Sequence, residues 1–162
     1  MQASGDPRLA ELERALHQRG FAVQRVTDMD GWLAYHAAFV ACVTAALYRC
    51  GGDPARLAAD RPVLALMCDA VTEAFRALRG SGVSGLPRNL AILHSRALKP
   101  VAVRYWARTM RSPAGELYFA AHARHAQPEM RVLAGQVTAR LGDSPAVGRL
   151  SELLLAAPPA AR

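Results

Sequence analysis

The stretch Gly31–Tyr48, with the sequence GWLAYHAAFVACVTAALY, decides the fold class of this chain. It contains no Asp, Glu, Lys or Arg, and its length is close to the minimum of about 17 residues for a membrane span. Tyr35, His36 and Thr44 interrupt its apolar character, and much of the remainder is weakly hydrophobic alanine. The stretch therefore predicts a central buried helix rather than a transmembrane one.

The composition extends this prediction to the whole chain. A chain of 162 residues, 52% of them hydrophobic, can bury a core without disulfide or metal support. It holds 33 alanines and a single isoleucine, Ile92, and this bias favours helix over sheet. We expect an all-α, multi-helix bundle.

The positions of prolines and the spacing of apolar residues locate the helices. Four prolines follow an Asp or Ser, at 6–7, 53–54, 112–113 and 144–145, and predict N-capped helix starts. One helix has an apolar stripe at helical spacing, made of Leu64, Met67, Val71, Phe75 and Leu78. The expected helices are 7–18, 32–48, 62–79, 87–98, 100–111, 113–126, 128–141 and 145–156, and 54–59 is expected to form a short turn.

Two segments depart from the helical pattern. Phe21–Val26 predicts one short strand near the N-terminus, and the glycine-rich run Gly80–Gly85 predicts a flexible loop. No GxGxxG sequence is present, so the residues that would bind a dinucleotide cofactor are unknown.

The cysteines and the first residues indicate a reducing compartment. Cys42, Cys50 and Cys68 form no CxxC pair and have no zinc spacing, so we expect free thiols. The first residues carry charges where a secretory signal needs an apolar stretch. A cytoplasmic location is the expectation.

Two groups of side chains could carry chemistry. His122, His125 and Glu129 have the i, i+3, i+7 spacing of a partial metal site, but Pro128 should interrupt that helix, so no metal site is predicted. His36 is interpreted as a buried histidine bonded to a carbonyl, or as a general acid or base that lines a pocket.

The net charge of +7 is concentrated between Glu73 and Glu116, where no acidic residue occurs. Arg104, Arg108 and Arg111 repeat on one helical face within this region. The pattern is open to three interpretations: a grip for a small anionic ligand, a nucleic-acid contact, or a solvated surface.

Three motifs carry a family resemblance. They are the run Asp28–Leu47, the run Pro128–Gly135 (PEMRVLAG), and the turn Gly142–Pro145 (GDSP). In this order they resemble the C-terminal helical domain of ketopantoate reductases, a 6-phosphogluconate dehydrogenase-like bundle. The resemblance implies a helix–strand remnant of a nucleotide-binding domain at 1–28 and a helical domain at 29–156. As a chain end, 157–162 is expected to be a frayed tail.

The resemblance also implies the site residues. The catalytic Lys of the family falls at Ala34, and its two Asn residues fall at Ala38 and Cys42. The family's Lys is the general acid that protonates the developing alkoxide, which alanine cannot do. Glu129 matches the family's glutamate, and His36 is a speculative replacement for the missing acid.

Function follows from the resemblance as an expectation. The chain would be the substrate-side domain of an NADPH-dependent 2-dehydropantoate 2-reductase, taking a small anionic 2-keto acid and receiving NADPH only through a Rossmann-domain partner. It would not be catalytic alone. The alternative is a non-catalytic module that forms a homodimer or binds a ligand, and a basic nucleic-acid-binding protein ranks below it. No membrane partner is expected.

Overall fold

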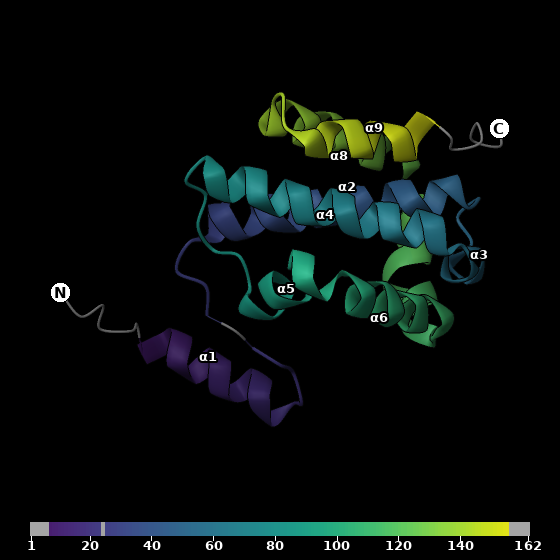
Figure 1. The fold of residues 1–162 in the computed structure, drawn as a ribbon. Coiled ribbons are helices and arrows are strands. Elements are labelled where there is room, and N and C mark those ends of the chain that lie inside the picture. The colour runs from purple at the N-terminus through teal and green to yellow at the C-terminus, as the bar shows by residue number, and fades with distance from the viewer. Residues whose placement is uncertain (1–6, 24, 156–162) are drawn as a thin grey trace.

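The computed structural model describes residues 7–23 and 25–155, and the described part is a bundle of helices (Figure 1). The predicted tail at 157–162 and the Asp6 cap lie outside the described residues. In chain order the elements are α1 Pro7–Gln18, α2 Met29–Arg49, α3 Pro54–Ala59, α4 Arg61–Gly80, α5 Arg88–Leu93, the 3-10 turn η1 Arg96–Leu98, α6 Lys99–Arg111, the π-helical segment η2 Gly115–Ala120, α7 Ala121–His125, α8 Gln127–Leu141 and α9 Pro145–Leu155.

The bundle has three layers. The pair α2 and α4 forms the middle layer, α8 and α9 cover one side of it, and α5 and α6 cover the other (Figure 1). The predicted apolar stripe of α4 is buried throughout, from Leu64 to Leu78. This stripe packs against α2, which lies beside it in the middle layer.

The central position of α2 confirms the prediction that Gly31–Tyr48 forms a buried helix. Twelve of its residues are buried, including Ala38, Cys42 and Leu47. By length and composition α2 alone among the described helices could cross a membrane, but 67% of its apolar window is covered by the rest of the bundle.

Of the four prolines expected to follow a capping residue, the one after Asp53 begins a helix with a side-chain cap. Asp53 accepts hydrogen bonds from the backbone N–H groups of Ala55 and Arg56, at 2.8 and 3.2 Å. The predicted serine caps are wrong. The Ser112 hydroxyl bonds to a carbonyl of the preceding helix, and the buried Ser144 hydroxyl has no hydrogen-bond partner.

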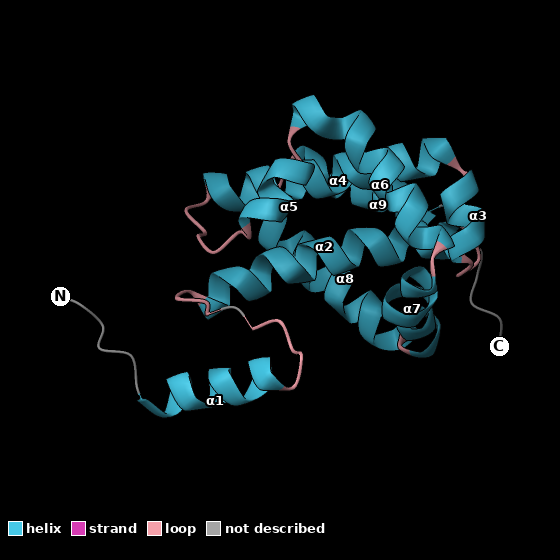
Figure 2. Ribbon diagram, turned by 90° about the horizontal axis from the view of Figure 1, so that it is seen from below, coloured by secondary structure: helices cyan, strands magenta, loops and turns pink. Residues whose placement is uncertain are grey.

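The predicted strand is also wrong. The described residues of Phe21–Val26 are irregular, because an isolated strand has no neighbour to hydrogen-bond with its backbone. The preceding helix α1 lies apart from the bundle (Figures 1 and 2) and buries none of its residues. Leu9 and Leu12 of its apolar stripe are each 55% exposed.

The loop that follows α4 is held against the start of α2, contrary to the flexible loop that its glycines predict. Tyr35 donates its hydroxyl to the Val83 carbonyl at 2.9 Å, and Ser84 bonds to the capping carboxylate of Asp28. These two bonds fix the loop. The Ser84 hydroxyl and the Gly31 N–H also hold the pKa of Asp28 low, because both stabilise its charged form. The loop therefore closes one end of the middle layer.

Two predicted helices are interrupted. The helix expected over 87–98 breaks at His94 and Ser95, between α5 and η1. The helix expected over 113–126 contains the π-helical segment η2, which brings Phe119 against Trp106 with ring centroids 5.8 Å apart. The helix break at His94 and the segment η2 both contribute side chains to one cluster of aromatic rings.

Candidate functional site

A groove of about 570 Å³ runs between the first half of α2 and the second half of α8. Most of its wall is apolar, with Ala34, Ala37 and Ala38 from α2 facing Leu133, Val137 and Leu141 from α8. The three alanines occur at i, i+3 and i+4, so they share one helical face, and their small side chains leave room for the groove. This volume falls within the range of small-molecule sites.

Two positions singled out by the resemblance border this groove. Ala34 and Ala38, where the family has its Lys and its first Asn, are 9% and 1% exposed and line the α2 wall. The third position, Cys42, is 1% exposed and belongs to the core. Burial raises the pKa of its thiol to about 12, so Cys42 is unreactive in the folded protein.

The polar side chains of the groove come from both helices. Asp30 lies in the first turn of α2, and Gln136 and Arg140 lie in the second half of α8. All three are exposed. The groove thus combines an apolar wall with one guanidinium, one carboxylate and one amide, which suits an organic anion better than an inorganic one.

The two candidate catalytic residues lie outside the groove. His36 is exposed and stacks on Trp32, with ring centroids 4.9 Å apart and planes 9° from parallel. Partial burial lowers the pKa of His36. The interpretation of His36 as a buried histidine is wrong, because its place on α2 leaves it at the surface. Glu129 is exposed in the first turn of α8. The structure does not bring these side chains to the groove, and their catalytic roles stay predictions.

Pro128 interrupts the helix as its sequence predicts. α7 ends at His125, Ala126 leaves the helical conformation, and α8 begins at Gln127. His125 Nδ1 lies 2.7 Å from the Ala121 carbonyl oxygen. Within residues 7–23 and 25–155, no three His, Cys, Asp or Glu side chains come together in a way that could hold a metal ion.

The basic residues between Glu73 and Glu116 divide into separate groups. Arg104, Arg108 and Arg111 share one face of α6, as their spacing predicts, and border a small pocket with Arg61. Lys99 instead forms an ion pair with Asp69 of α4, with 2.8 Å between Nζ and Oδ2. Only part of the positive charge is therefore gathered on a single surface.

The sequence interpretation missed His94. This residue is 4% exposed, and its Nε2 accepts a hydrogen bond of 3.2 Å from the indole N–H of Trp106. No local pattern marks His94, because its partner stands on another helix, α6. From the sequence alone, a histidine at the end of a helix is expected to lie at the surface.

Comparison with known proteins adds no family to this description. No family model matches the chain, and neither a curated protein nor a solved structure matches it.

Proposed function

We propose that this chain is a non-catalytic helical module that binds a small organic carboxylate in the α2–α8 groove. One observation carries the proposal: Ala34 and Ala38, the positions of catalytic side chains in the resemblance to ketopantoate reductases, both border the groove that also contains Arg140. The site would thus keep a groove and the guanidinium of Arg140 for binding, and would lack the Lys and Asn side chains that the family uses in catalysis.

The lining of the groove defines the ligand class. Arg140 can pair with a carboxylate in bidentate geometry. Asp30 disfavours a second negative charge and can accept a hydrogen bond from a hydroxyl. The alanine and leucine walls between them suit a branched apolar body. 2-Dehydropantoate, the substrate that the resemblance implies, combines a carboxylate, a dimethyl-substituted carbon and a hydroxyl.

The groove lacks a proton donor suited to reduction of a ketone. No lysine or histidine is among the described residues that border it. An alanine at position 34 cannot protonate a developing alkoxide, so binding would not be followed by turnover. Any hydride would come from NADPH held by a separate nucleotide-binding domain. Even with that domain present, the groove would lack the general acid that protonates the alkoxide.

Nuclear magnetic resonance tests this proposal directly. We expect added 2-dehydropantoate to shift the amide signals of 33–38 and 133–141, with weaker binding of 3-methyl-2-oxobutanoate, which lacks the hydroxymethyl group. In the same samples NADPH should not be oxidised. Turnover of NADPH by the purified chain would refute the non-catalytic assignment, and signal changes confined to other helices would refute the groove.

A further inference from the structure

A second pocket, of about 340 Å³, lies between α4 and the segment that contains α5 and η1. Arg76 and Arg79 of α4 border it on one side, and Arg96 of η1 borders it from the other. Phe75 and Leu86 supply apolar wall. The second pocket shares no residue with the α2–α8 groove.

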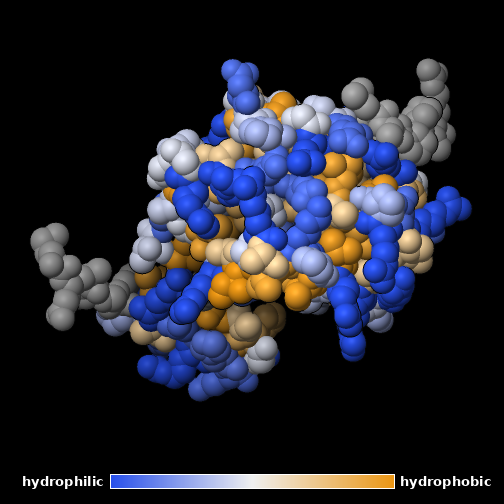
Figure 3. All heavy atoms as spheres, in the orientation of Figure 1, coloured by the Kyte–Doolittle hydropathy of each residue, from blue (hydrophilic) through white to orange (hydrophobic). Residues whose placement is uncertain are grey.

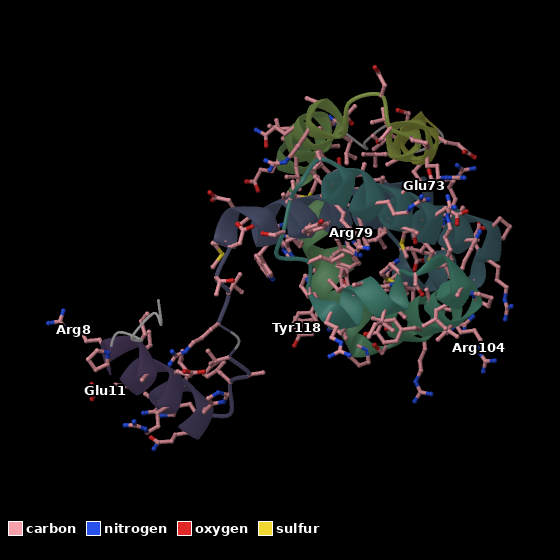
Figure 4. The ribbon with its side chains drawn as sticks, turned by 60° about the vertical axis from the view of Figure 1, so that its left-hand side comes forward. Arg8, Glu11, Glu73, Arg79, Arg104 and Tyr118 are labelled. Carbon is pink, nitrogen blue, oxygen red and sulfur yellow. The ribbon has the colours of Figure 1, made fainter. Side chains whose placement is uncertain are left out.

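The charge of the second pocket is uncompensated. None of its three arginines forms an ion pair with a described carboxylate, and no Asp or Glu borders the pocket. Arg79 does interact with the Tyr35 hydroxyl. The nearest acid in the α4 sequence, Glu73, lies toward α9, on a different side of the helix from Arg79 (Figure 4), and its Oε2 is 3.1 Å from Arg149 Nε.

A buried histidine supplies a further donor. His94 borders the second pocket, and its Nδ1 is hidden from solvent without a hydrogen-bond partner. The indole of Trp106 can only donate, so Nε2 of His94 must accept, and the neutral ring then carries its proton on Nδ1. The Nδ1–H group of His94 therefore has no partner in hydrogen-bond geometry, although the backbone of Cys68 interacts with the ring.

This protonation state holds at neutral pH. Burial lowers the pKa of His94 to about 4, because the charged ring would be desolvated. The backbone of Cys68 opposes this shift, but it does not meet hydrogen-bond geometry with the ring, so Nδ1 remains unpaired. A second proton would also place an N–H on Nε2, facing the indole N–H of Trp106.

We propose that the second pocket binds the phosphoryl group of a soluble phosphate monoester. Arg76, Arg79 and Arg96 would bind the phosphate oxygens, and the Nδ1–H of His94 would donate to one of them. A phosphate monoester has three terminal oxygens and about two negative charges, which match this set of donors better than a carboxylate does. Its organic part would lie against Phe75 and Leu86.

Calorimetry with phenyl phosphate and inorganic phosphate tests the second pocket in the full chain. Arg76→Ala and Arg96→Ala remove exposed side chains, so both variants should fold. Each should weaken phenyl phosphate binding about tenfold, as loss of a charge-assisted hydrogen bond does. Arg88→Ala is the matched control, because Arg88 is exposed on α5 and does not border the pocket; it should change affinity less than about twofold.

The ring of His94 provides a second readout. Bound phenyl phosphate should shift the Nδ1 proton signal of His94 in the native chain, and the same shift in Arg96→Ala should require about tenfold more phenyl phosphate. The proposal is overturned if Arg88→Ala weakens binding as much as Arg96→Ala, or if phenyl phosphate does not bind at millimolar concentration. A short DNA duplex provides a further test. If the duplex binds more tightly than phenyl phosphate, and all three variants weaken duplex binding equally, the arginines belong to a general basic surface and the proposal is overturned. Each outcome is independent of the carboxylate groove, because the two sites share no residue.

Discussion

Trp106 on α6 donates its indole N–H to Nε2 of His94, with 3.2 Å between the two nitrogens. The pair lies in a cluster of aromatic rings: Phe75 meets His94 edge-on at 5.7 Å, and Phe39 meets Trp106 at 5.3 Å. The hydrogen bond sets the tautomer of His94. It also joins α6 to the segment between α5 and η1. Burial in this cluster lowers the pKa of His94 to about 4.

The stability of the folded chain should depend on the protonation of His94. Its pKa is about 4 in the folded chain and 6.5 in the reference state, so between these values the unfolded chain binds a proton that the folded chain does not. The free energy of unfolding must then fall as the pH decreases from 6.5 towards 4, by an amount that approaches about 3 kcal/mol.

Denaturant titrations between neutral pH and pH 4.5 measure this effect. His94→Gln should show a shallower loss of stability with acid than the native chain, because glutamine does not titrate. A nuclear magnetic resonance titration that gives His94 an ordinary histidine pKa would contradict the account.

Gly85 should be much more sensitive to alanine than Gly82. Both have positive φ angles, of 88° and 83°, so alanine is strained at either position. At Gly85 an added Cβ would also lie 2.9 Å from the Trp32 backbone nitrogen, whereas at Gly82 it would meet nothing within 4 Å. We expect Gly82→Ala to cost about 1 kcal/mol and Gly85→Ala more than about 2 kcal/mol. Equal losses in thermal unfolding would mean that the loop is not packed on α2.

The three cysteines should differ in reactivity. Cys42 and Cys68 are 1% exposed, and burial raises the pKa of each thiol to about 12. Cys50, which follows α2, is partly exposed, and its partial burial also raises the pKa of its thiol. A thiol reagent at mildly alkaline pH should therefore label Cys50 alone in the folded chain, and all three residues in denaturant. Mass spectrometry that finds Cys42 labelled under native conditions would contradict the buried position of α2.

The sequence could predict the elements that depend on local signals. The bounds of α1 match the predicted range 7–18, because a proline begins the helix and the following residues favour helix. The range 54–59, predicted as a short turn after a capped proline, forms the short helix α3. The apolar stripe of α4 is buried as its spacing predicts. In these segments the helical pattern alone decides the structure.

Features that depend on distant partners could not be predicted. Phe21 is 61% exposed in an irregular segment, although its run has strand-like composition, because no other strand is present in the described residues. Gly80–Gly85 is held by Tyr35, which is 48 residues from its partner Val83 in the sequence. The π-helical segment η2 likewise follows the packing of Phe119 on Trp106.

The candidate site was only partly accessible from sequence. Ala34 and Ala38 were identified through the family resemblance, but Arg140 and Leu133 were not, because the groove exists only where α8 packs on α2. Figure 3 shows hydrophobic residues at several separate places on one face of the molecule, including its lower edge beside α1, so exposed apolar residues do not single out one site on this face.

The affinity of 2-dehydropantoate for the native chain, Arg140→Ala and Arg131→Ala tests the carboxylate groove most directly. Both arginines are exposed on α8, but only Arg140 borders the groove, so Arg131→Ala controls for the loss of one positive charge. Calorimetry should show binding to the native chain, a loss of about tenfold in Arg140→Ala, and a change of less than about twofold in Arg131→Ala. Equal affinities in the two variants, or no binding of 2-dehydropantoate at millimolar concentration, would contradict the assignment of the α2–α8 groove as a carboxylate-binding site.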